Sequence, residues 1–195
     1  MKRRSWSLLA TMAVALGVAT LAPKDALAQE PACEPQAEVE DRASPYDSVS
    51  MAVGDGVVKV CYSRPSLRGR TMIGGDAVPY GQVWRTGANE PTTLHATVPV
   101  SIAGIEVGPG SYSLYTIPRE AEDWTLIVNA STSQWGHESG YPDVEDQDVG
   151  RTTVTMQALD STVEQFTIRA AEDGGALVLE WQNSRVYVPI TADGS

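Results

Sequence analysis

The feature that most constrains the fold is an alternation of apolar and polar residues with a period of two, which runs from Val49 almost to the end of the chain. Residues that alternate in this way point to opposite faces of a β-strand. The alternating segments are short and are separated by glycine, proline and aspartate, as at Gly54-Asp55-Gly56. No convincing amphipathic helix of ten or more residues interrupts them. The pattern therefore predicts an all-β protein.

The segments predicted to be strands share this alternation or a short apolar core. They are residues 49–53, 57–62, 92–98, 100–107 with a turn at 103–104, 111–117, 124–128, 152–158, 163–170, 176–181 and 186–190. We expect these roughly ten strands to form an antiparallel β-sandwich or a jelly-roll-like barrel. The pattern leaves the order of the strands in the sheets open.

Residues 1–28 have the three-part order of a secretory signal peptide. Basic residues at positions 2–4 precede an apolar segment at 8–21, and Ala26-Leu27-Ala28 forms a small-x-small cleavage site. The apolar segment is shorter than the roughly 20 residues that a membrane-spanning helix needs. We expect an exported protein, periplasmic or extracellular, that begins near Gln29 and has no stable membrane insertion after cleavage. The sequence leaves open whether the general secretory or the twin-arginine route is used.

Acidic residues dominate the charge of the chain. The whole sequence has 14 basic and 25 acidic residues and a net charge of −11, and without residues 1–28 the net charge is −14. This balance argues against a nucleic-acid partner, because such proteins usually present a basic face. Residues 29–45 combine acids and prolines with almost no large apolar side chain. We expect an acidic mobile leader at 29–45, followed by a single β-sandwich domain at 46–191.

The two cysteines lie in different parts of this plan. Cys33 is in the leader, whereas Cys61 is in a predicted strand. In an oxidising compartment, two cysteines favour one disulfide, and Cys33–Cys61 is the candidate. The sequence leaves two free thiols open as the alternative.

A long irregular segment at residues 64–90 breaks the strand pattern. Connections longer than about 12–15 residues are uncommon in compact domains and are often functional. Arginines are concentrated here in an otherwise acidic protein, at Arg64, Arg68, Arg70 and Arg85. The segment is therefore the candidate functional loop.

The candidate ligand-binding residues of this loop are Arg70, Arg85, Asn89 and Glu90. A guanidinium suits planar, bidentate contact with carboxylate, phosphate or sulfate. The predicted ligand is a small anion or a carbohydrate. In the alternative interpretation, Arg85 pairs with Glu90 or another carboxylate and only braces the loop.

Three functions from different classes stay open. The chain can be a non-catalytic binding module, a structural domain of the cell envelope, or a hydrolase. In the hydrolase, Glu90 would be the acid or base, Arg85 would hold an anionic group or sugar, and Asp76 would be a second carboxylate. The catalytic residues, and whether the protein is an enzyme at all, are left undetermined by the sequence.

Other chemistry has little support in the sequence. Two histidines and two distant cysteines are too few for a common zinc site, so we predict no metal and no cofactor. Trp124, Trp135 and Trp181 can line a carbohydrate face, but such aromatic side chains more often fill a sandwich core.

Several motifs resemble a bacterial family, the domain of unknown function 2911. They are YSRPSLRGRTMIGGDAVPYGQVWRTGANEPTTL at 62–94, AGIEVGPGSYSLYTIP at 103–118, DWTLIVN at 123–129, QWG at 134–136 and LVLEWQNSRVYVPI at 177–190. The resemblance extends from about residue 43 to 190, and the VPYGQVWRTGANE block is its most specific part. The family pattern has an aromatic residue in a GR-x-IFG motif where this chain has Met72-Ile73-Gly74. The resemblance implies an exported, mostly β protein and brings no established reaction, cofactor or catalytic residue.

Overall fold

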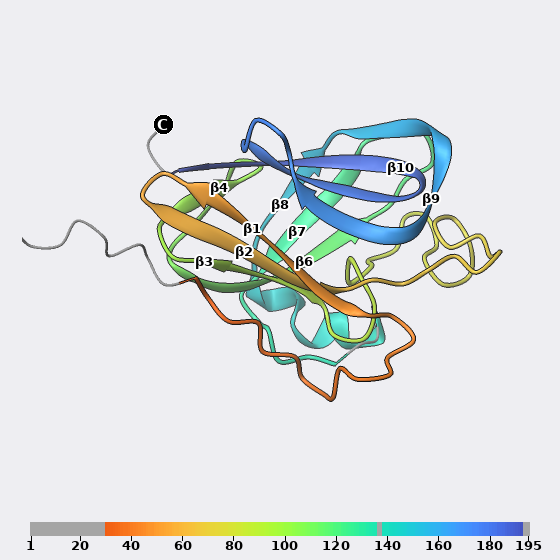
Figure 1. Cartoon of the computed structure of the whole chain (residues 1–195), viewed down its shortest axis with the longest axis horizontal. Helices are drawn as coiled ribbons and strands as arrows, with labels where there is room; N and C mark the ends of the chain where they lie inside the picture. The colour runs from red at the N-terminus through yellow and green to blue at the C-terminus, as the bar shows by residue number, and fades with distance from the viewer. Residues whose placement is uncertain (1–29, 136–137, 193–195) are drawn as a thin grey trace, which may run out of the picture.

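The computed structural model describes residues 30–135 and 138–192, so the predicted signal peptide lies outside the described residues. In the described part, the protein is an antiparallel β-sandwich of two sheets (Figure 1). The described residues form ten strands and two short 3-10 helices, η1 (Glu138–Asp143) and η2 (Glu145–Gln147). The all-β prediction is confirmed.

The larger sheet has six antiparallel strands. Across the sheet, their order is β1 (Tyr46–Val53), β2 (Gly56–Ser63), β3 (Thr92–Ala96), β6 (Gly110–Ile117), β7 (Trp124–Asn129) and β8 (Asp148–Val154). The predicted hairpin at Gly54-Asp55-Gly56 joins β1 to β2, with Val53 opposite Gly56. Gly54 has a φ of 56°, a left-handed conformation that glycine adopts with little strain.

The smaller sheet has four antiparallel strands. Their order is β5 (Ile105–Val107), β4 (Val100–Ile102), β10 (Ala176–Ala192) and β9 (Met156–Ala170). The chain thus crosses to the smaller sheet for the β4–β5 hairpin and returns to it for its last two strands, which are the longest.

The two long strands differ from the sequence-based expectation of shorter ones. Residues 176–181 and 186–190 were each expected to form a strand, and in the structure both belong to β10. The alternation of apolar residues breaks between them because the register with β9 shifts on either side of Gln182, whose φ is 53°. A bulge of this kind turns side chains to new directions without ending the strand.

The main core lies between the two sheets. The inward-facing residues of β2 include Val58, Val60 and Tyr62, and they pack in one cluster with Phe166 of β9 and Trp181 of β10. The hydroxyl group of Tyr62 donates a hydrogen bond to the carbonyl oxygen of Ile168, 3.1 Å away, which satisfies its buried polar end. One face of the larger sheet is thus fully used for folding.

The long segment 64–90 closes one end of this core. Trp84 stacks on Trp181 with ring centroids 5.6 Å apart, and Met72 and Ile73 are buried in the same cluster. The side chain of Gln182 accepts hydrogen bonds from the backbone N–H groups of Met72 and Ile73 and donates one to the carbonyl oxygen of Ile73. Much of the segment is therefore a structural cover and not an open ligand loop.

Candidate functional site

The outer face of the six-stranded sheet carries polar side chains that the alternation places away from the core. Thr93 and His95 of β3 and Ser111 of β6 point to this face because their neighbours Leu94 and Leu114 point inward. The leader, of which residues 30–45 are described, crosses this face before it enters β1 (Figure 1). The site is built between the leader and the sheet.

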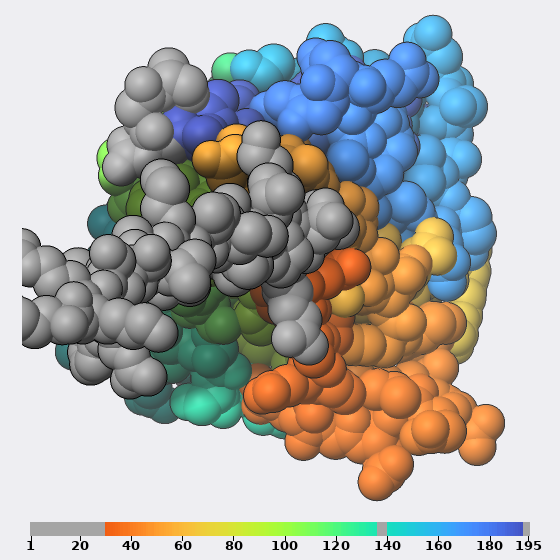
Figure 2. All heavy atoms as spheres, turned by 60° about the vertical axis from the view of Figure 1, so that its left-hand side comes forward, coloured from red at the N-terminus to blue at the C-terminus, as the bar shows by residue number. Residues whose placement is uncertain are grey.

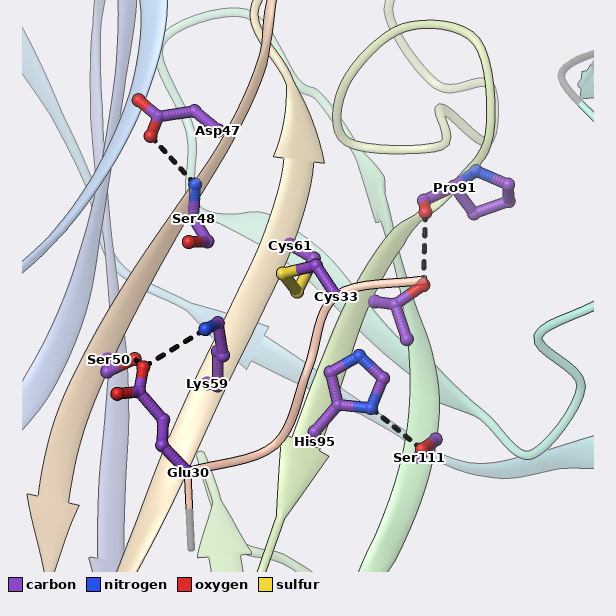
Figure 3. The surroundings of a disulfide bond; sticks show 11 residues. Glu30, Cys33, Asp47, Ser48, Ser50, Lys59, Cys61, Pro91, His95 and Ser111 are labelled. Carbon is purple, nitrogen blue, oxygen red and sulfur yellow. Dashed lines mark hydrogen bonds and ion pairs between the residues drawn. A yellow bond between two sulfur atoms is a disulfide. The ribbon is translucent and has the colours of Figure 1, made fainter. Parts of the chain in front are cut away.

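A disulfide attaches the leader to β2. Cys33 and Cys61 are bonded, with their Cα atoms 5.8 Å apart (Figure 3). Nearby, Glu30 forms an ion pair with Lys59 at 3.1 Å and accepts a hydrogen bond from the hydroxyl group of Ser50. The sequence left free thiols open as an alternative, and the structure contains the disulfide.

A buried ion pair attaches the other end of the leader. Nη1 of Arg42 lies 3.0 and 2.9 Å from the two carboxylate oxygens of Glu90, and the two side chains are only 8% and 5% exposed. The remaining donors of Arg42 bond to the carbonyl oxygens of Ala37 and Glu38. Arg42 therefore fixes the path of the leader and pairs it with Glu90.

These contacts bear on the expectation of a mobile leader. That expectation came from the scarcity of apolar side chains in residues 29–45, and the described residues 30–45 do contain no helix or strand. A disulfide and a buried ion pair hold a segment without needing apolar burial. β1 begins at Tyr46, the residue at which the folded domain was expected to start.

A polar pocket of about 230 Å³ lies between the leader and the sheet. It is lined by side chains from the leader, the start of β1, strands β3 and β6 and the chain after β7. These residues are Glu34, Gln36, Tyr46, Glu90, Thr93, His95, Ser111 and Thr132. Figure 2 shows the leader at the molecular surface, next to the residues that follow it in the chain. We call this the leader pocket.

The leader also closes the far side of the leader pocket. The side-chain amide of Gln36 donates hydrogen bonds to the carbonyl oxygens of Thr132 and Gln134, 2.9 and 3.1 Å away. Because these residues follow β7, Gln36 connects the leader to the segment that covers the other half of the sheet. That segment packs through Tyr141 and Val144 on Tyr115 and Ile127.

His95 and Ser111 face each other on neighbouring strands of the pocket floor. They are paired in register, and Nδ1 of His95 lies 2.8 Å from the hydroxyl oxygen of Ser111 (Figure 3). Burial lowers the pKa of His95 below its usual 6.5, Lys59 lowers it further, and Glu34 opposes the shift. Burial, with the nearby charge of Glu90, raises the pKa of Tyr46 to about 12. At neutral pH, the pocket thus contains a neutral imidazole and a protonated phenol.

The lowered pKa of His95 predicts a pH effect on stability. The unfolded chain binds a proton at His95 at a higher pH than the folded protein, so the contribution of this group is complete above about pH 6.5 and is lost as the pH falls toward the folded pKa. His95→Gln keeps a polar partner for Ser111 but does not titrate. The stability of the wild type relative to this variant should fall between pH 7.5 and 5 in urea unfolding. A difference that is constant with pH would contradict the assignment.

The arginines of the 64–90 segment mostly make internal contacts. Arg64 pairs with Asp47 at 3.1 Å and donates to the carbonyl oxygen of Phe166. Arg68 donates to the carbonyl oxygen of Ala43, 2.7 Å away, and therefore helps to hold the leader. These guanidinium groups serve as braces, which weakens the case for an anion site built from them.

The structure separates the four residues predicted to bind a ligand. The side chain of Asn89 is linked to that of Glu90 through Ser63 and Arg42: the hydroxyl oxygen of Ser63 accepts hydrogen bonds from Asn89 at 3.1 Å and from Arg42 at 3.3 Å. Arg70 lies in an exposed turn and donates to the carbonyl oxygens of Ser66 and Leu67. Of the four, only Glu90 lines the leader pocket.

Arg85 does not line the leader pocket. It lies beside a small cavity of about 70 Å³ that is also lined by Trp84 and Trp181. Glu90 forms an ion pair with Arg42, because the leader returns along the sheet and brings its one basic residue to Glu90.

Sequence reasoning missed most of the pocket. One sequence feature could have drawn attention to Arg42, since it is the only basic residue within 29–45. The feature that could have identified His95 and Ser111 is weaker, since both are simply polar residues on the outward face of predicted strands. The sequence does not show that the leader covers that face, and without this cover the polar residues have no common site.

The described residues therefore define an all-β, disulfide-linked sandwich with a polar pocket under an N-terminal segment. The chain belongs to the family described as "Protein of unknown function (DUF2911)", whose model matches residues 44–190. Neither a curated protein nor a solved structure matches the chain. The family match begins at residue 44, near the end of the leader, so it contains the floor of the leader pocket but not Glu34, Gln36 or Arg42.

Two further observations concern the described part of the chain. No three His, Cys, Asp or Glu side chains in residues 30–135 and 138–192 are arranged to hold a metal ion. No helix within the same ranges has the length and apolar character needed to cross a membrane.

Proposed function

We propose that this protein is an exported, non-catalytic binding module that holds a small polar ligand in the leader pocket. The observation that supports this most is the construction of the pocket. Two independent attachments, the Cys33–Cys61 disulfide and the Arg42–Glu90 ion pair, hold the leader over a polar cavity. A cavity with a few converging polar groups is the usual form of a small-ligand site.

The lining favours an uncharged ligand over an anion. Among the described residues, Glu34 and Glu90 both line the pocket, and no lysine or arginine does. The strongly acidic chain also repels anions at long range. Of the two ligand classes suggested by the sequence, carbohydrate and anion, the pocket therefore supports the former.

The hydrolase is the weaker candidate. Both carboxylate oxygens of Glu90 accept hydrogen bonds from Arg42, which occupies the atoms that would transfer a proton. Asp76 is exposed in the 64–90 segment and does not line the leader pocket.

A screen of small polar compounds by thermal shift and calorimetry tests the binding function. Glu34→Gln should weaken binding of any ligand that the screen finds, because Glu34 lines the pocket. Glu122→Gln is the matched control, since it removes the same charge from an exposed turn between β6 and β7 and should leave binding unchanged. Equal effects of the two substitutions would contradict a ligand in the leader pocket.

Export is the second part of the proposal, and the order of charges, apolar residues and small residues in 1–28 supports it. We expect the mature protein to begin at or near Gln29. Intact-mass measurement of protein from the extracytoplasmic fraction checks this. A mass that includes Met1 would contradict export with cleavage.

A further inference from the structure

The leader pocket has a chemical character that points to one class of ligand. The hydroxyl groups of Ser111 and Thr132 and the imidazole of His95 can each donate or accept hydrogen bonds. The hydroxyl group of Thr93 donates to the carbonyl oxygen of Pro91, 3.3 Å away, and can still accept. The amide nitrogen of Gln36 is occupied by two carbonyl oxygens, so its side-chain oxygen is the atom left to accept from a ligand. Such a mixture matches neighbouring hydroxyl groups, each of which both donates and accepts.

Two of the features that a cationic ligand would use are already occupied. The guanidinium of Arg42 lies 5.6 Å from the ring centroid of Tyr46, where a cation would interact with the aromatic face. The same guanidinium forms an ion pair with Glu90. The protein's own cation therefore takes one of the two carboxylates and the phenol ring among the described lining residues, and the groups left, apart from Glu34, are neutral and polar.

An exposed tryptophan directly follows a residue that bonds to the leader. Trp135 is 49% exposed, whereas the other described tryptophans, Trp84, Trp124 and Trp181, are buried. Trp135 directly follows Gln134, whose carbonyl oxygen bonds to the lining residue Gln36. A half-exposed indole can pack on the apolar face of a ligand ring while the polar edges of that ring stay in contact with water.

We infer that the ligand is an uncharged saccharide, whose hydroxyl groups bond in the leader pocket and whose ring face packs on Trp135. This inference rests on the proposed function and names its ligand class. The pocket volume of about 230 Å³ is below the roughly 300–1,000 Å³ that is typical of drug-sized ligands. It suits one sugar unit, such as the end unit of a longer chain that continues past Trp135.

The test uses the mature, disulfide-bonded protein and three groups of probes. The neutral group comprises glucose, galactose, mannose, N-acetylglucosamine and their short oligomers; the cationic group comprises glucosamine and spermidine; the anionic group comprises glucuronate and phosphate. Binding is measured by calorimetry and tryptophan fluorescence at low and high salt. We expect at least one neutral saccharide to bind with an affinity that salt changes little, because no charge pair is formed.

Two aromatic substitutions then locate the contact. Trp135→Ala should weaken saccharide binding by about tenfold, and Trp135→Tyr should restore part of it. Tyr80→Ala is the matched control, because Tyr80 is also an exposed aromatic residue, at 42%, but lies in the 64–90 segment. Since Trp135 is exposed, the melting temperature should change little and a loss of binding can be assigned to the contact.

The two levels of proposal fail in different ways. Salt-suppressed binding of a cationic probe that Glu34→Gln weakens, or of an anionic probe that Glu34→Gln strengthens, would overturn the saccharide inference and leave the binding function standing. Saccharide binding that is equally strong in Trp135→Ala would overturn the stacking part of the inference. Failure of every saccharide in the panel to bind overturns the ligand class, and failure of all three groups counts against the binding function itself.

Discussion

Replacement of Arg42 by alanine is expected to lower the free energy of unfolding by about 3–5 kcal/mol, a large effect for a residue outside the β-sandwich. Arg42 and Glu90 are almost completely buried, so the substitution leaves the Glu90 carboxylate without its counter-charge in a poorly solvated place. It also removes the hydrogen bonds to Ala37, Glu38 and Ser63 that shape the leader. Urea unfolding of the mature protein measures the change.

Two controls separate the buried pair from ordinary surface electrostatics. Glu145→Gln breaks the exposed pair between Glu145 and Arg151 and should cost at most about 1 kcal/mol. In a double-mutant cycle of Arg42→Ala with Glu90→Gln, the second change should cost much less than it does alone, since contacting residues couple by about 0.5–3 kcal/mol. Additive effects in this cycle would show that the two side chains do not act as a pair.

The sandwich could be predicted from the sequence because its strands follow a rule that is local. Val58 and Val60 alternate with Lys59 and Cys61, and this pattern alone states which side chains face the core. The hairpin at residues 54–56 was equally local. The order of the strands was not predictable, because distant segments pair, as Ile102 of β4 does with Ile190 of β10.

The candidate site was harder to predict because it depends on a segment with no pattern of its own. The leader has no alternation and few apolar residues, so nothing local indicates that Glu34 and Gln36 come to lie over β3 and β6. Arginine density drew attention to the 64–90 segment. There, Arg64 and Arg68 bond to Asp47 and to backbone carbonyl groups, a use of arginine that composition does not distinguish from ligand binding.

The Cys33–Cys61 disulfide is expected to stabilise the fold by about 3 kcal/mol, because it closes a loop with a sequence separation of 28 residues in the unfolded chain. Cys33→Ser is the better variant for this measurement. Cys33 is partly exposed on the leader, whereas Cys61 is only 1% exposed, so serine at position 61 would also bury a hydroxyl group. The free energy of unfolding in urea, without reductant, should fall by about this amount.

Reduced wild-type protein provides the control for that variant, since it should be nearly as unstable as Cys33→Ser, and reductant should leave the variant itself unchanged. Loss of the disulfide should also speed amide exchange across residues 34–41, which would then be attached mainly through Arg42. Because Glu34 and Gln36 in this stretch line the leader pocket, ligand affinity should fall together with the protection. Equal stability of the oxidised and reduced wild type would contradict the stabilising role of the disulfide. Faster amide exchange with unchanged ligand affinity would mean that the leader covers the pocket without contributing to binding.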